Sequence, residues 1–411
     1  MEKLILPLFQ GYGIELEYMI VNKQTLNVDP ITDKVLYTVA KNYDNEVERG
    51  EISWSNELAL HVIELKTTKP AKSLKNLEIS FQDNVRQINS ILESFNACLM
   101  PTAMHPWMDP YQEMHLWPHE YNPIYEAYNR IFNCCGHGWA NLQSTHINLP
   151  FADDIEFAQL HAAIRLLLPI MPALTASSPI VEEKLTGILD NRLHVYQNNA
   201  KIIPSITGKV IPEHCSSEKN YRESILASMY HEIAPYDPDK LLQHEWLNSH
   251  GAIARFERNT IEIRILDIQE CPQADIAIAT AIVETLKSLI AEKWHELNDK
   301  EWEVEPLYAI FSSCVKEGSE AIISNRHYLD LFGFPANATQ CRAKELWQHI
   351  INSLDLNSLG NLKGILEMII DKGTLAQRIE KAWKSQPTKH QLREIYEKLC
   401  YCLAHGELFK G

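Results

Sequence analysis

The chain has 411 residues, of which 45% are hydrophobic and 22% charged, and its formal net charge is −16 at pH 7. This size and composition predict a soluble globular protein with at least one sizeable core, and the low count of 15 glycines excludes a collagen-like or low-complexity chain. The acidic balance argues against binding to nucleic acid or to an anionic membrane. No apolar run reaches the roughly 18 residues of a membrane span, and we expect no signal peptide because no small-residue cleavage site follows the short apolar start.

The nine cysteines are scattered and include no C-x-x-C pair. An odd number without the spacing of a metal or redox motif predicts reduced thiols. Reduced thiols are typical of a cytoplasmic protein, which is where we expect this chain to work.

The first 70 residues have the pattern of strands. Apolar residues alternate with Glu15 and Glu17 between Gly13 and Val21, and residues 51–67 again mix β-forming and acidic residues. The spacing then predicts, in chain order, a helix of about 25 residues from Ser73, a short strand at 98–103, a loop at 105–123 and a short helix that ends near Cys135.

The rest of the chain mixes further strands with longer helices. The expected elements are a strand at 139–149, a helix at 152–176, a long irregular region at 180–222, a strand or hairpin at 252–267 that turns at Arg258–Asn259, and a helix at 272–297. Residues after 301 are mainly helical, for example at 374–385 and 389–404. Because no regular strand–helix–strand alternation occurs, we predict an α+β fold with an antiparallel sheet.

Two common nucleotide-binding motifs are absent. Gly11 and Gly13 are followed by Leu16 where the dinucleotide-binding motif needs a third glycine. Lys209 follows Gly208, but Ile203 occupies the position of the first glycine of a phosphate-binding loop. A bound nucleotide must therefore be held by other residues.

Glu15 and Glu17 are the strongest local indication of a functional site. On a strand these two carboxylates share a face and lie about 6–7 Å apart. On an otherwise apolar strand they repel each other unless a cation lies between them, and Mg²⁺ accepts such oxygen ligands. A solvent-facing strand edge is the alternative explanation.

Three later segments add residues of the same chemistry. Glu57 and Glu64 would point to opposite faces of one regular strand, but a bulge or turn between them brings both to one site. His146 lies on a largely apolar strand, and Glu262 shares a strand face with Arg264. Each segment alone is also explained by a structural histidine or a surface ion pair, whereas together they predict one polar face.

With these residues in this order, the chain resembles the glutamate–cysteine ligase family, and most closely its bacterial carboxylate–amine ligase branch within the glutamine-synthetase superfamily. The resemblance covers about residues 11–290. It rests on GIELEY at 13–18, QSTHINLPF at 143–151, ALTASSP at 173–179 with Asn191-Arg192 downstream, and RNTIEIRILD at 258–267. Residues 300–411 contain no matching motif, so we divide the chain into a ligase catalytic domain at 1–300 and a helical C-terminal region at 301–411.

The resemblance implies a curved antiparallel β-sheet with flanking helices, whose concave face holds two or three Mg²⁺ or Mn²⁺ ions. One ion would be held by Glu17, Glu57 and Glu64. The ion on the ATP side would be held by Glu15, His146 and Glu262.

The resemblance also implies the residues that contact substrates. Arg264 would neutralise the transferring γ-phosphoryl group, with Arg255 as a second candidate, and Arg192 would bind the substrate carboxylate or a phosphate. The remaining expected neighbours of ATP or substrate are Ser178, Asn148 and His105.

The implied reaction uses ATP to convert a carboxylate into an acyl phosphate, which an amine then attacks to form an amide. Such phosphoryl transfer needs cations rather than a nucleophilic side chain. The leading reaction is synthesis of γ-glutamylcysteine from glutamate and cysteine, a step of glutathione biosynthesis.

Other functions remain open at this point: a ligase for a different amine, a phosphotransferase on the same scaffold, a zinc protein using His115 and His119, and a non-catalytic protein that binds partners through its C-terminal helices. The expected partners are small molecules, with a homo-oligomer also open. The sequence does not identify the amine, the oligomeric state, the role of residues 301–411 or any regulation by cysteines.

Overall fold

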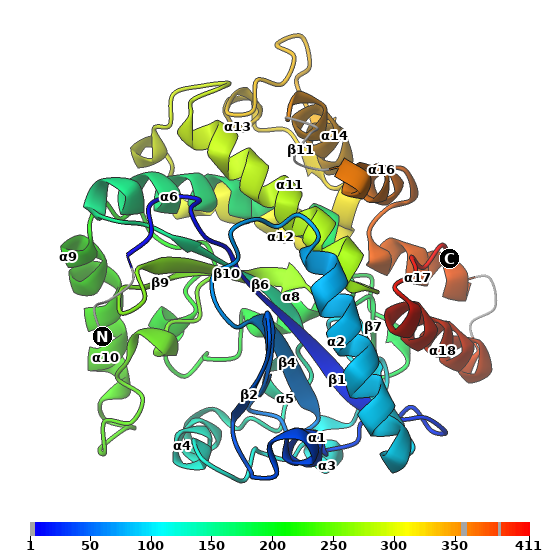
Figure 1. The fold of residues 1–411 in the computed structure, drawn as a ribbon. Helices are drawn as coiled ribbons and strands as arrows, with labels where there is room; N and C mark the ends of the chain where they lie inside the picture. Colours follow the sequence, from blue (N-terminus) through cyan, green and yellow to red (C-terminus); the bar gives the residue numbers. More distant parts are fainter. Residues whose placement is uncertain (1–4, 355–359, 385–387) are drawn as a thin grey trace.

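The computed structural model describes residues 5–354, 360–384 and 388–411. Within them, an eight-stranded antiparallel sheet forms the centre, with the order β2-β3-β4-β1-β6-β10-β9 and with β5 paired to the far end of β1 (Figure 1). Its strands are β1 (Gly13–Asn22), β2 (Glu46–Arg49), β3 (Ile52–Asn56), β4 (Val62–Thr67), β5 (Ala97–Met100), β6 (Ser144–Pro150), β9 (Ala252–Arg255) and β10 (Thr260–Asp267). Two small two-stranded sheets pair β7 (Ile180–Val181) with β8 (Lys184–Leu185), and β11 (Ile322–Ile323) with β12 (Cys341–Arg342).

Helices of very different lengths surround this sheet. Those before residue 300 are α1 (Thr32–Ala40), α2 (Leu77–Leu92), α3 (Pro110–Glu113), α4 (Asn122–Phe132), α5 (His137–Ala140), α6 (Asp154–Leu167), α7 (Pro172–Thr175), α8 (Asn191–Tyr196), α9 (Glu218–Tyr221), α10 (Ala227–Ile233) and α11 (Pro272–Ile290). Those after it are α12 (Val304–Glu317), α13 (Arg326–Asp330), α14 (Ala343–Ser353), α16 (Lys363–Lys372), α17 (Leu375–Lys384) and α18 (Lys389–His405). No helix of the described residues is long and apolar enough to cross a membrane.

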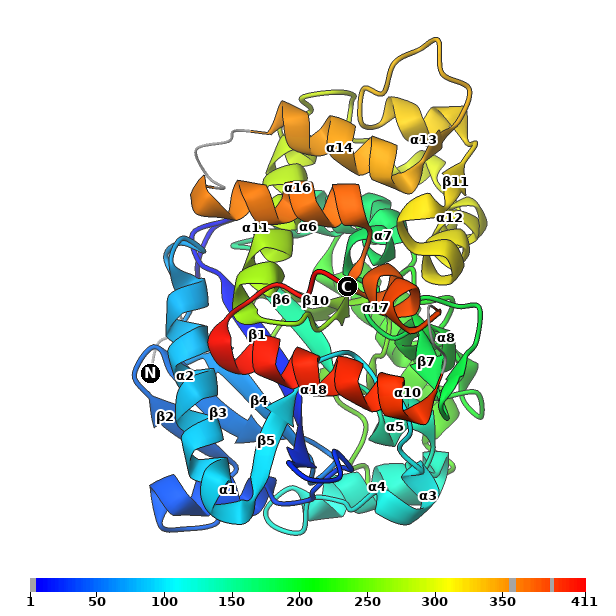
Figure 2. The same cartoon turned by 90° about the vertical axis from the view of Figure 1, so that its right-hand side faces the viewer.

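The alternation along β1 separates the two faces of the sheet. Leu16 and Tyr18 are fully buried in the main core together with Phe81 and Val85 of α2. Helix α2 packs beside α11 over this face, and α6 packs against α11 (Figure 1, Figure 2). The opposite face of β1 carries Glu15 and Glu17, followed by Met19 and Val21, which pack in a second apolar cluster.

The C-terminal helices pack on the same body as the sheet. Helix α18 contacts β5 and α2, and α16 contacts α11 (Figure 2). Arg378 of α17 forms a buried ion pair with Glu270 (2.5 Å), just after β10. Gln82 of α2 donates a hydrogen bond to the carbonyl oxygen of Leu403 (2.8 Å).

The predicted α+β class with an antiparallel sheet and a helical C-terminal region is confirmed. Residues 51–67 form the hairpin β3–β4. Residues 252–267 form the hairpin β9–β10, which is the second of the two predicted forms. Two elements that we did not predict, α1 and β2, lie between β1 and β3.

Several predicted elements are shorter than expected, including the helix from Ser73, where α2 spans only Leu77–Leu92. The strand at 139–149 was wrong over its first residues, where α5 ends at Ala140 and β6 begins only at Ser144. The helix at 152–176 is interrupted between α6 and α7, because Pro169 and Pro172 cannot donate the helical hydrogen bond. The helix at 272–297 ends at Ile290, and the region at 180–222 contains the short helix α8.

Candidate active site

Four neighbouring strands bring the predicted acidic residues to one face of the sheet. Glu15 of β1 lies directly opposite His146 of β6, and Glu17 lies opposite Glu64 of β4. Residues opposite each other in an antiparallel pair share a face. Glu262 of β10 joins them from the other side of β6.

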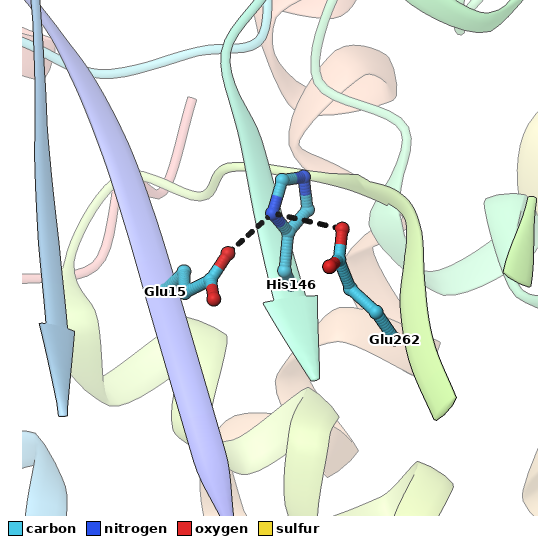
Figure 3. Close-up of side chains that lie close together, drawn as sticks. All are labelled: Glu15, His146 and Glu262. Atoms are coloured by element: carbon cyan, nitrogen blue, oxygen red, sulfur yellow. Dashed lines mark hydrogen bonds and ion pairs between the residues drawn. The ribbon is translucent and has the colours of Figure 1, made fainter. Parts of the chain in front are cut away.

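His146 connects Glu15 and Glu262 (Figure 3). Its Nδ1 lies 2.7 Å from Glu15 Oε2 and 3.9 Å from Glu262 Oε1. Burial alone would lower the pKa of His146, but the hydrogen bond to Glu15 and the nearby carboxylates raise it to about 9. Without a bound cation, the imidazole is therefore protonated between carboxylates.

A second cluster uses the other nitrogen of the same histidine. His146 Nε2 lies 3.8 Å from Glu17 Oε1. Glu17 accepts a hydrogen bond from the backbone N–H of Ser144 (2.6 Å), and Glu64 accepts one from Ser55 Oγ (2.7 Å). Burial and the Glu15 carboxylate raise the pKa of Glu64 to about 7. Without a cation, the carboxylates of this cluster therefore do not all ionise readily.

Glu57 lies one residue beyond β3, in the turn before β4. Burial and the charges of Glu64 and Glu17 raise the pKa of Glu57 well above its usual range. The turn therefore brings Glu57 and Glu64 to the same site, which a single straight strand could not do.

The donor set of these clusters fits a hard divalent cation. Glu15, His146 and Glu262 form one group whose ligand atoms lie within 4.8 Å of one another, and Glu17, Glu64 and His146 form another. Carboxylate oxygens are the ligands that Mg²⁺ and Mn²⁺ prefer, and imidazole is compatible with the transition metal. A cation between them would also relieve the repulsion that raises the pKa of Glu64.

Two cavities open beside these clusters. The larger, of about 610 Å³, is lined by Glu17, Glu57 and Glu64. The smaller, of about 390 Å³, is lined by Glu15 and Asn148. Three charged residues line both cavities, namely Glu46, Lys66 and Arg258.

The larger cavity also has an aromatic wall. Its members come mainly from short helices outside the sheet: Tyr121, Tyr125 and Tyr128 around α4, Trp139 of α5, Tyr196 of α8, and Trp246. The space therefore combines an acidic floor with flat, largely apolar sides.

Three predicted arginines line the larger cavity. Arg264 lies at a bulge of β10 and its Nε is 3.3 Å from Glu262 Oε1. Arg255 approaches the other oxygen of Glu262 at 3.2 Å. Arg192 of α8 is buried, and its Nη2 has no hydrogen-bond partner among the described residues. The guanidinium therefore has one buried donor beside the cavity that no described residue satisfies.

The other predicted contact residues lie elsewhere. Asn148 donates a hydrogen bond to Glu15 Oε1 (3.0 Å) and lines the smaller cavity. Ser178 donates to Asp267 Oδ2 (3.0 Å) and lines neither cavity. His105 is fully buried with its Nε2 2.7 Å from the Leu26 carbonyl oxygen, again outside both cavities.

The histidine pair considered for zinc does not form a cluster of metal ligands within the described part of the chain. His119 instead contacts Asp33 through Nε2 at 3.2 Å and stacks on Tyr43. The only His-containing clusters found there use His146.

The lining residues of the larger cavity that sequence reasoning missed include Lys66, Tyr196 and Arg258. Lys66 lies opposite Glu15 in the sheet and forms ion pairs with Glu64 (3.2 Å) and Glu46 (2.9 Å). Tyr196 follows Arg192 by four residues, which on a helix places both on one side. A helix assigned to 191–196 would have revealed it.

Comparisons with known proteins identify the family and similar folds. The sequence model of Glutamate-cysteine ligase family 2 matches residues 12–312. An uncharacterized protein of Archaeoglobus fulgidus is 32% identical over 399 residues, which is 97% of this chain and 99% of that protein. A Bradyrhizobium protein named "Putative glutamate--cysteine ligase 2" is 25% identical over 276 residues, 66% of this chain and 59% of its own length.

Solved structures share the fold at low sequence identity. The glutamate–cysteine ligase of Francisella tularensis, solved in complex with AMP, aligns with a TM-score of 0.58 at 14% identity, covering 98% of this chain and 90% of that one. A bifunctional glutathione synthetase of Pasteurella multocida aligns with the same TM-score of 0.58 and 14% identity, covering 97% of this chain and 53% of that one.

Proposed function

Because the chain belongs to glutamate–cysteine ligase family 2, we propose that it is an ATP-dependent carboxylate–amine ligase. The observation that carries this proposal is the pair of clusters that share His146, beside arginines in one cavity. The reaction would form an amide through an acyl phosphate. A carboxylate is a poor electrophile, so phosphorylation must come before attack by the amine.

The two clusters would hold Mg²⁺ or Mn²⁺. Glu15, His146 and Glu262 would form one site. Glu17 and Glu64 would form the other, with Glu57 of the same cavity as the expected third carboxylate. Bound cations would neutralise phosphate oxygens and hold them in line for transfer.

The side chains that line the two cavities would determine which substrate group binds in each of them. Lys66 and Arg258 line both spaces and would attract phosphate oxygens at their border. Arg264 and Arg255 would neutralise charge on the transferring phosphoryl group. Arg192 would hold a carboxylate at the cavity wall, which orients the reacting oxygen.

For the substrates, we propose glutamate as the carboxylate and cysteine as the first amine to test. The family supports this pair, and the chain is expected to act in the cytoplasm, where its nine free cysteines stay reduced. A different amine in the same cavity remains the alternative within this function.

The test is ADP release by the purified protein with Mg²⁺-ATP, glutamate and a panel of amines, followed by mass spectrometry of the products. We expect slow release until both a carboxylate and an amine are present, together with an amide product. Equal release without amine, and no amide with any amine, would overturn the ligase in favour of a phosphotransferase. Stoichiometric zinc in the purified protein would instead support the zinc alternative.

A further inference from the structure

Two of the three nitrogens of the Arg192 guanidinium have hydrogen-bond partners. Its Nε donates a hydrogen bond to Asp267 Oδ1 at 2.5 Å, and its Nη1 approaches the carbonyl oxygen of Arg264 at 3.4 Å. Its Nη2 has no partner among the described residues, although the side chain is only 2% exposed. Arg192 lines the larger cavity, so this buried cation forms part of the cavity wall and keeps one nitrogen without a partner in the described part of the chain.

Asp267 is itself fixed by other groups. It ends β10 and its side chain is fully buried. Its Oδ2 accepts hydrogen bonds from the backbone N–H of Ser177 (2.8 Å) and from Ser178 Oγ (3.0 Å). The carboxylate therefore has one oxygen bound by the loop after α7 and the other left for Arg192.

The backbone of Arg192 is held at the same place. Its N–H donates to Ser178 Oγ at 3.1 Å, and Asp190 caps α8 by accepting from the N–H of Leu193 at 2.8 Å. Backbone and side chain of Arg192 are thus both held by one buried network. This leaves little freedom for the guanidinium to turn away from the cavity.

We propose that Asp267 is a positioning residue for the ligase reaction: it holds Nε of Arg192 and thereby fixes the guanidinium at the cavity wall, where this cation binds an anionic oxygen of the carboxylate substrate. This inference rests on the proposed function. Asp267 does not line the cavity, so it acts through Arg192 rather than on the substrate. A charge-assisted hydrogen bond of this kind also gives the planar guanidinium a fixed orientation.

The first test replaces Asp267 by Asn, which keeps the shape and removes the charge. We expect the KM for the carboxylate substrate to rise by about 10-fold to 10²-fold, with the KM for ATP within about twofold. The matched control is Glu270→Gln, which removes the charge of another fully buried carboxylate paired with an arginine, outside both cavities. This control should lower the melting temperature and leave the carboxylate KM unchanged. Equal KM changes in both variants would mean a structural role only and would overturn the inference.

The second test uses chemical rescue, which a merely structural ion pair would not produce. Arg192→Ala removes the cation, and free guanidinium at low millimolar concentration should bind Asp267 and restore part of the activity. The double variant R192A/D267N should show no rescue, with sodium chloride at equal concentration as the salt control. Rescue of equal size in both variants, or none in Arg192→Ala, would contradict a role for Asp267.

Guanidinium binding can be followed without turnover. A rise in the melting temperature of Arg192→Ala with guanidinium, absent from R192A/D267N, reports binding to Asp267 alone. If no amide forms with any amine, the proposed function fails, while this measurement still decides whether Asp267 holds the cation. If Asp267→Asn does not fold, the response of Arg192→Ala to guanidinium decides the question.

Discussion

Arg264 is the single residue on which the proposed phosphoryl transfer depends most. Its Nε pairs with Glu262, and its Nη1 is 3.4 Å from the carbonyl oxygen of Asn248. Replacement by Lys keeps the charge but loses the planar fork that grips two oxygens. We predict that Arg264→Lys lowers kcat by at least ~10²-fold, with a smaller change in the KM for ATP. Steady-state kinetics test this, and an unaltered kcat would remove Arg264 from the reaction.

Tyr196 offers a second test at one side chain. Its hydroxyl is buried and has no partner among the described residues, and the residue lines the larger cavity. A ligand oxygen would complete this hydrogen bond, so we predict that Tyr196→Phe lowers kcat/KM by about 10-fold. Tyr308→Phe is the control, because that hydroxyl contacts Gln197 just after the same helix at 2.8 Å. A similar loss in both variants would point to a disturbed α8 instead.

The carboxylates can be tested through cation binding. Glu→Gln keeps the shape of the side chain but weakens a metal ligand. A cation that binds the folded protein raises its stability, so the wild type should melt at a higher temperature with Mg²⁺-ATP. We predict that Glu15→Gln, Glu17→Gln and Glu262→Gln lose most of this rise and most activity. Glu48→Gln, an exposed carboxylate on β2, should keep both. If all three site variants keep the full rise in melting temperature and normal turnover, these carboxylates do not bind the metal ion.

Among the elements, the strands were predictable and their pairing was not. The period of two along β1 correctly placed Glu15 and Glu17 on one face and Leu16 on the other. The register that puts Glu15 opposite His146 depends on residues 131 positions apart, and no local pattern encodes it. Helix α8 was missed because only six residues form it, between irregular segments.

Helix α6 contains a histidine that makes stability depend on pH. His161 is 1% exposed, and neither ring nitrogen has a hydrogen-bond partner among the described residues. Its ring lies 5.5 Å from that of Phe157 and 5.9 Å from that of Tyr221. Burial and the charge of Arg165 lower the pKa of His161 from 6.5 to about 3. The unfolded chain therefore binds this proton more tightly than the folded one, so stability is full above pH 6.5 and falls as the pH drops towards 3.

We predict that His161→Phe removes this part of the acid sensitivity. Between pH 7 and pH 5 the wild type should lose about 2 kcal/mol more of its free energy of unfolding than the variant, since each pKa unit contributes about 1.4 kcal/mol. Urea unfolding at the two pH values measures the difference. His231→Phe, at an exposed position on α10, should retain the wild-type slope. Equal slopes for wild type and His161→Phe would show that His161 is not the group responsible.

At the scale of the whole molecule, the C-terminal residues contribute backbone hydrogen bonds that hold distant segments in place. The backbone N–H groups of Leu189 and Asp190, just before α8, donate to carbonyl oxygens at the end of α12 at 3.2 and 3.0 Å. The N–H of Ala376 donates to the carbonyl oxygen of Ala176 at 2.8 Å. Residues 301–411 thus hold the segments that carry Arg192 and its network. Holding these segments needs only backbone groups and a packed surface, which explains why residues 301–411 contain no motif.

One buried ion pair tests whether the C-terminal region and the sheet unfold together. Arg378 contacts Glu270 at 2.5 Å, and both side chains are at most 2% exposed. Breaking a buried pair leaves an uncompensated charge, so Arg378→Met and Glu270→Gln should each lower the free energy of unfolding by about 3–5 kcal/mol. The double variant should lose less than the sum, because the second change removes the charge that the first left unpaired. In urea unfolding followed by circular dichroism and tryptophan fluorescence, we expect one transition seen equally by both probes. Additive losses, or a separate transition for residues 301–411, would show that this region folds independently of the sheet and does not anchor it.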